Sequence, residues 1–163
     1  VCECTRSDKR TYTSRRLDVE LKQVTPLLSV AAAIRAEDIS DLVAAGYQAV
    51  INNRFDGEED NQVSSAVLQE TTTAAGLEYT SLPVVPGKIS DADIEAFTSL
   101  LKSLPGPVLA FCRTGTRAIN LWALSEARHL DVDVILAAAS KHGYDLENLR
   151  PRLLERAAAE STD

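Results

Sequence analysis

Residues 107–118 constrain the fold more than any other part of this chain, because they combine a buried strand, a tight loop and a helix start. The four apolar residues at 108–111 predict a short buried strand, and the polar residues at 113–116 predict a loop. The run from 118 to 127 predicts a helix. Loop amides and a helix N-terminus around one centre carry partial positive charge, so this arrangement favours a bound anion.

A single cysteine, Cys112, stands where this strand passes into the loop. A thiol beside a helix N-terminus and two arginines ionises more easily than a free thiol, which predicts a nucleophile. The alternative is that Cys112 is a small core residue at a strand end. The glycine and the two arginines favour the nucleophile. We predict Cys112 and Arg117 as catalytic residues, and Arg113, Thr114, Gly115 and Thr116 as anion-binding residues.

Strand and helix patterns alternate along the rest of the chain. Such alternation predicts a single α/β domain, with a central, mainly parallel sheet flanked by helices. Sites in these sheets lie beyond the carboxyl ends of the strands, where both Cys112 and the loop at 52–59 fall. The predicted elements are two short strands around Pro26 within 21–33, strands at 49–51 and 78–83, and helices at 37–45, 65–75, 132–141 and 149–159, with a further helix beginning after Ser90.

Composition limits the classes of partner. The net charge is −7 in 163 residues, which argues against a nucleic-acid surface. The sequence has no run of 18 apolar residues and no apparent secretory signal, so we expect no membrane partner. Three cysteines without metal-ligand spacing predict no metal, no cofactor and a cytoplasmic location. Residues 1–18 are polar and without period, and we expect a flexible tail there and a catalytic domain at 19–160.

Four segments resemble the phosphatase-like domain of beta-lactamase hydrolase-like proteins, a bacterial family. They are residues 50–59, 106–117, 121–124 and 143–146. The resemblance implies a tyrosine-phosphatase-like fold of the dual-specificity type. It also implies a sulfide-oxidising enzyme as a partner, because the family domain occurs fused to sulfide-handling enzymes. The chain departs from the family pattern at Phe55, where proline is usual, at Ala118, where serine is usual, and at Ala32-Ala33, which replaces a Gly-Gln pair.

Phosphatase chemistry is the first activity that this resemblance implies. Tyrosine-phosphatase loops resemble His-Cys-x5-Arg followed by Ser or Thr, whereas this chain has Phe111, a four-residue spacing and Ala118. Such phosphatases also use an aspartate on the preceding loop to protonate the leaving oxygen. Residues 80–87 hold no carboxylate. Asp56 or Glu58 could reach in from the neighbouring loop, and we name Arg54 and Asp56 as candidate substrate-binding residues.

Sulfur transfer is the second activity, because the Cys-x4-Arg spacing is similar to that of rhodanese-like sulfurtransferases. The Cys112 thiolate would attack the outer sulfur of thiosulfate or of a low-molecular-weight persulfide and form a persulfide. Sulfite or a thiolate leaves as a stable anion, so no general acid is needed. We therefore predict a sulfurtransferase that acts on small sulfur-containing anions. The alternatives are a phosphatase that works through a Cys112 phosphocysteine on phosphoesters, and an inactive anion-binding module.

Overall fold

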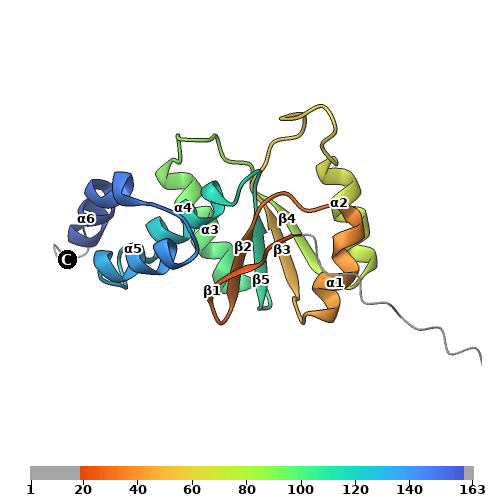
Figure 1. Ribbon diagram of the computed structural model, residues 1–163, viewed down its shortest axis with the longest axis horizontal. Helices are drawn as coiled ribbons and strands as arrows, with labels where there is room; N and C mark the ends of the chain where they lie inside the picture. The colour runs from red at the N-terminus through yellow and green to blue at the C-terminus, as the bar shows by residue number, and fades with distance from the viewer. Residues whose placement is uncertain (1–18, 160–163) are drawn as a thin grey trace, which may run out of the picture.

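Five short strands form one mixed sheet in the computed structural model, which describes residues 19–159 (Figure 1). The strands lie in the order β1-β2-β5-β3-β4, with β1 antiparallel to β2 and every other pair parallel. The predicted mainly parallel sheet is therefore confirmed, and so are the two strands around Pro26. Their bounds are Lys22–Thr25 for β1, Leu28–Ala31 for β2, Ala49–Asn52 for β3, Glu78–Ser81 for β4 and Val108–Phe111 for β5.

Strand β5 lies in the middle of the sheet, as its apolar run predicts. All four of its residues are buried, and β2 and β3 pair with it in parallel on either side. A strand covered on both faces and both edges can be continuously apolar, because no residue faces water. The carboxyl end of β5 is consequently flanked by the ends of β2 and β3. Phe111 pairs with Ala31 on one side and with Asn52 on the other, so Cys112 follows directly after the carboxyl end of the central strand.

Helices cover both faces of the sheet (Figure 1). On one face, α1 and α2 bury Leu42 and Leu68 against Leu109 of β5. On the other face, α3 and α4 bury Phe97 and Ile119. The helix bounds are Ile39–Ala44 for α1, Ser65–Ala74 for α2, Asp91–Ser103 for α3, Thr116–Glu126 for α4, Val132–Lys141 for α5 and Arg150–Ala158 for α6, with short 3-10 helices η1 at Ala36–Asp38 and η2 at Glu147–Leu149.

Local sequence signals explain where several helices begin. Ser64 accepts a hydrogen bond from the backbone of Val67 at the start of α2. Ser90 and Asp93 form a reciprocal capping box at the start of α3, where the sequence predicts a helix after Ser90. Such caps satisfy backbone N–H groups that have no partner within the helix.

Helix α4 begins at Thr116, two residues before the predicted start at 118. Gly115 precedes it with φ at 87°, a conformation that glycine adopts without the penalty of a Cβ atom. The sharp turn at Gly115 lets the helix begin earlier, and Arg117 is therefore in its first turn. The predicted tail at 1–18 lies outside the described residues. Among residues 19–159, no helix combines the length and the apolar character that a membrane crossing requires.

Candidate active site

The Cys112 thiol lies at the base of the loop between β5 and α4. The residue is 1% exposed, and the backbone N–H of Gly115 donates to its Sγ atom at 3.1 Å. Backbone bonds join the loop to the end of β2, from Cys112 N to Ala31 O and from Ala33 N to Arg113 O. A backbone N–H directed at sulfur stabilises the negative charge of a thiolate. The structure therefore gives Cys112 the surroundings of a nucleophile.

A pocket of about 200 Å³ lies over this loop. One wall comes from the loop after β4, at Pro86 and Gly87. The other wall holds the predicted anion-binding residues except Gly115, together with Arg117. Asn120 also lines the pocket, and it is not among the residues predicted from the sequence. Its position four residues after Thr116 places both side chains on one face of α4, and this spacing could have revealed it. The residues on the α4 side are Arg113, Thr114, Thr116, Arg117 and Asn120.

Residues 112–117 hold the predicted nucleophile, and we call them the catalytic loop. Arg117 is buried and joins this loop to two neighbouring loops. Its side chain is 7% exposed. One terminal nitrogen donates to the carbonyl oxygens of Asn53 and Val84, each at 3.1 Å. Both terminal nitrogens bind the Glu58 carboxylate, at 2.6 and 2.8 Å. This fork-to-fork geometry is the strong form of a charge-assisted hydrogen bond, and it fixes the plane of the guanidinium.

Ion pairs continue from Arg117 to the other arginine of the loop. Glu58 also accepts from Arg54 at 3.2 Å, and Arg54 donates to Glu59 at 2.8 Å. Glu59 then pairs with Arg113 at 3.0 Å. The alternating charges Arg117, Glu58, Arg54, Glu59 and Arg113 form one network, which we call the loop ion-pair network. It ties residues 54–59 to both ends of the catalytic loop.

The two candidate substrate-binding residues, Arg54 and Asp56, bind other residues of the protein. Arg54 is 4% exposed and does not line the pocket, because its guanidinium lies between Glu58 and Glu59. Asp56 accepts a hydrogen bond from Ser65 N at 2.7 Å, and so holds the start of α2. In this structure both residues shape the loop that anchors Arg117.

The carboxylates of the loop ion-pair network are ionised near neutral pH. The hydrogen bonds from Arg117, with a smaller opposing effect of burial, lower the pKa of Glu58 from 4.5 to about 2. Hydrogen bonding to Arg54 likewise lowers the pKa of Glu59. The same Glu58 contact raises the pKa of Arg117, and the nearby charge of Cys112 adds to that shift. Neither glutamate is therefore a proton donor in this arrangement.

The lowered pKa of Glu58 predicts an acid-sensitive contribution to stability. The folded-state pKa of about 2 lies below the ordinary value of 4.5. The ionised carboxylate therefore stabilises the fold fully above about pH 4.5, and this contribution is lost as the pH falls toward about 2. Urea unfolding at a series of pH values measures it. Glu58→Gln should flatten the decline of the unfolding free energy in this window, and an unchanged decline would contradict the assignment.

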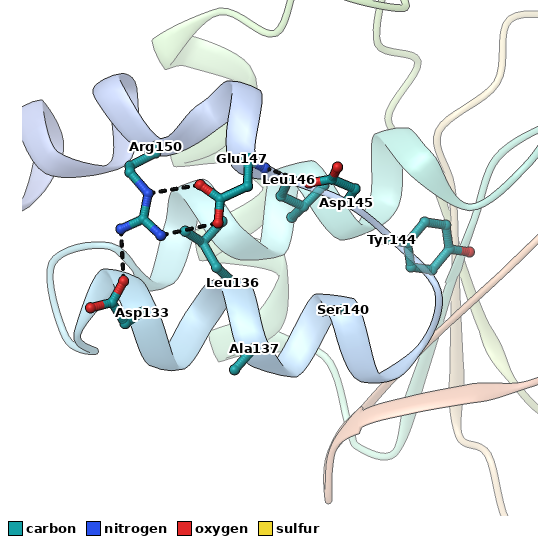
Figure 2. A pocket seen from close by; sticks show the side chains of 9 residues that line it. All are labelled: Asp133, Leu136, Ala137, Ser140, Tyr144, Asp145, Leu146, Glu147 and Arg150. Atoms are coloured by element: carbon teal, nitrogen blue, oxygen red, sulfur yellow. Dashed lines mark hydrogen bonds and ion pairs between the residues drawn. The ribbon is translucent and has the colours of Figure 1, made fainter.

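A larger cavity, of about 470 Å³, lies elsewhere, beside α5 and η2 (Figure 2). Three of its charged side chains bind one another, since Arg150 contacts both Glu147 and Asp133. Tyr144 stands at one end of the cavity, with its hydroxyl pointing away from these ion pairs. No cysteine lines this cavity. The loop residues next to Cys112, among them Arg113, Thr114 and Arg117, line the smaller pocket and not this cavity.

Known sequences that are similar to this chain belong to the family that its motifs resemble. The sequence model described as the phosphatase-like domain of beta-lactamase hydrolase-like proteins matches residues 20–129. The beta-lactamase hydrolase-like protein of Xylella fastidiosa is 34% identical over 130 residues, which are 78% of this chain and 30% of that protein. The protein of the same name from Agrobacterium fabrum is 35% identical, over 84% of this chain and 32% of its own length. The chain thus spans about a third of these curated relatives.

Solved structures show the same fold. A candidate phosphatase of Neisseria meningitidis superimposes with a TM-score of 0.75 at 32% identity, over 82% of this chain and 96% of its own. Pseudomonas aeruginosa TpbA in complex with phosphotyrosine gives a TM-score of 0.64 at 16% identity, over 93% and 100% of the two chains. Kinase-associated phosphatase gives 0.65 at 15% identity, over 90% and 98%. The tyrosine-phosphatase-like fold that the sequence predicts is confirmed, and the chain belongs to the family of phosphatase-like domains found in beta-lactamase hydrolase-like proteins.

Proposed function

We propose that this chain is a cysteine-dependent phosphatase that hydrolyses phosphate monoesters, with Cys112 as its nucleophile. The observation that carries the proposal is the hydrogen bond from Gly115 N–H to Cys112 Sγ, in a loop that leads into the N-terminus of α4. A thiolate and a cradle of amides in the same place suit a phosphoryl group. Membership of a phosphatase-like family supports this reading over the sulfurtransferase that the sequence analysis preferred.

The reaction would take place in two displacements. The Cys112 thiolate attacks phosphorus, the bond from phosphorus to the ester oxygen breaks, and the alkoxide or phenoxide leaves with the electron pair. Water then attacks the phosphocysteine, the sulfur–phosphorus bond breaks, and inorganic phosphate is released with the thiolate restored. The amides of residues 113–117 and the Arg117 cation would stabilise the charge on the phosphoryl oxygens. Arg113, Thr114 and Thr116 line the pocket over the loop.

The occupied carboxylates limit the substrates that this site would turn over quickly. Glu58 and Glu59 are held by arginines, Asp56 caps α2, and residues 82–88 contain no carboxylate. General acid catalysis contributes about 10²–10⁴-fold, and this site would forgo that factor. A phenol has a pKa of about 10 and leaves as an anion far more readily than an alkoxide. We therefore infer aryl phosphates, such as phosphotyrosine, as preferred substrates over alkyl phosphates.

The same occupied carboxylates favour a second candidate, sulfur transfer. The Cys112 thiolate would attack the outer sulfur of thiosulfate, the sulfur–sulfur bond would break, and sulfite would leave with the electron pair. An acceptor thiolate would then attack the outer sulfur of the Cys112 persulfide and release the original thiolate. Neither departure needs a proton donor. For this activity we propose a sulfide-oxidising enzyme as partner, and for either activity a reducing compartment such as the cytoplasm, because the thiol must stay reduced.

Two assays separate the candidates. We expect hydrolysis of an activated aryl phosphate and of a phosphotyrosine peptide. A phosphoserine peptide should be slower by at least about 10²-fold, because its alkoxide leaving group depends on the acid assistance that this site does not supply. Incubation with thiosulfate or glutathione persulfide, followed by intact mass measurement, tests sulfur transfer. A gain of one sulfur at Cys112 without any phosphate release would replace the phosphatase by the sulfurtransferase. If neither product is detected, the remaining interpretation is an inactive anion-binding module.

A further inference from the structure

Three successive peptide groups of the catalytic loop are held from outside by their carbonyl oxygens. In a planar trans peptide, the N–H and the C=O point in opposite directions. Anchoring each carbonyl on the outside therefore turns the next residue's N–H toward the inside of the loop, where an anion would sit. The three bonds are Ala33 N to Arg113 O at 3.3 Å, the Tyr144 hydroxyl to Thr114 O at 3.0 Å, and Ile119 N to Gly115 O at 3.0 Å.

The middle peptide group, between Thr114 and Gly115, is held at both ends. Its carbonyl accepts the hydrogen bond from the Tyr144 hydroxyl, and its N–H donates to the Sγ atom of Cys112 at 3.1 Å. Rotation of this group would place a carbonyl oxygen against the sulfur and repel a thiolate. Of the three anchors, the one on this peptide is a side chain, and it comes from 30 residues farther along the chain.

The surroundings of Tyr144 keep its hydroxyl in place as a donor. A Cβ atom at position 115 would collide with this hydroxyl, so glycine is required for the close approach as well as for its positive φ. The ammonium group of Lys22 lies 4.3 Å from the centre of the ring. Burial, followed by the charges of Cys112 and Glu20, raises the pKa of Tyr144. The hydroxyl therefore stays protonated at neutral pH.

We propose that Tyr144 is a positioning residue that fixes the orientation of the Thr114–Gly115 peptide and so keeps its N–H directed at the Cys112 sulfur. This inference rests on the proposed function in one respect, namely that Cys112 acts as the nucleophile. Tyr144 would not touch the substrate. It would act through the loop backbone, from a segment between α5 and η2 that lies outside the catalytic loop.

Tyr144→Phe tests the proposal, because it removes the hydroxyl and retains the ring that contacts Lys22. We expect alkylation of Cys112 by iodoacetamide to slow by about fivefold near neutral pH, the factor expected for the loss of one hydrogen bond. The rate should also reach its plateau at a higher pH than in the wild type. Peptide mapping assigns the alkylated cysteine, and circular dichroism verifies that the variant is folded.

Tyr47→Phe is the matched control. Tyr47 donates to Ser29 at 2.7 Å, so this variant also loses one tyrosine hydrogen bond, but it leaves the catalytic loop unaltered. Its alkylation rate and pH profile should equal those of the wild type. If Tyr144→Phe also matches the wild type in both rate and profile, the proposal is overturned. If both variants slow alkylation equally, a general loss of stability explains the effect and the proposal fails.

Gly115→Ala, made in the wild type and in the Tyr144→Phe background, supplies a second test of the contact between the two residues. The added methyl group would displace the Tyr144 hydroxyl, so it should slow alkylation in the wild type and slow it less in the Tyr144→Phe background. Strictly additive effects would count against the coupling. Alkylation needs no substrate, so these results stand apart from the proposed function. If Tyr144→Phe slows the alkylation of Cys112 but the wild type hydrolyses no phosphate ester, the proposed phosphatase is refuted and the role of Tyr144 stands.

Discussion

Cys112→Ser is expected to lower the turnover of an aryl phosphate by about 10⁴-fold or more, because a serine hydroxyl is not ionised near neutral pH and the loop offers no base to activate it. Steady-state hydrolysis of the activated ester measures this loss. The substitution changes one atom in a residue that is 1% exposed. The pocket should therefore persist, and the variant should still bind inorganic phosphate in a calorimetric titration.

Two controls make the result specific to Cys112. A variant with Ser at both Cys2 and Cys4 should keep the activity of the wild type, because these cysteines lie outside the predicted site. The sulfur gain after incubation with thiosulfate, if any occurs, should disappear in Cys112→Ser alone. Turnover by Cys112→Ser at a rate comparable to that of the wild type would refute Cys112 as nucleophile for either candidate reaction.

Glu58→Gln is expected to have the largest effect on stability of any single loop substitution. The change preserves the size of the side chain but removes the charge between two buried guanidinium groups. The side chains of Arg117 and Arg54 are only 7% and 4% exposed. Arg117 would lose the carboxylate that balances its charge, while Arg54 would keep its ion pair with Glu59. Breaking a buried ion pair in this way costs about 3 kcal/mol or more. Urea unfolding should show a lower midpoint with an unchanged slope.

Glu147→Gln is the matched control for this prediction. Glu147 also accepts two hydrogen bonds from an arginine, Arg150, but its side chain is 61% exposed. Water can replace its contacts, so the unfolding midpoint should change much less than in Glu58→Gln. Glu58→Gln should in addition reduce the turnover of aryl phosphate, because Arg117 loses the partner that fixes its plane. Equal midpoints for the two variants would show that the loop ion-pair network contributes little to stability.

The sequence by itself determined the α/β class and the place of Cys112 directly after the central strand. The alternation of strand and helix patterns predicts the sheet, and the apolar run at 108–111 predicts its central strand, because continuous burial is typical of interior parallel strands. The capping box at Ser90 and Asp93 is equally local. These features depend on neighbouring residues, so they can be read without knowledge of the fold.

Only the tertiary structure decided what surrounds Cys112. The pair between Arg117 and Glu58 joins residues 59 positions apart, and the bond from Tyr144 to Thr114 spans 30 positions. A charged segment with an Asp-Gly turn, such as 54–59, has the same sequence whether its carboxylates are hydrated or are bound to arginines. A substrate-binding role for this loop is therefore a reasonable prediction from the sequence. The packing of β3 beside β5 brings that loop to the catalytic loop. Its carboxylates then bind Arg117, Arg54 and Arg113, and no periodicity in the sequence encodes those long-range contacts.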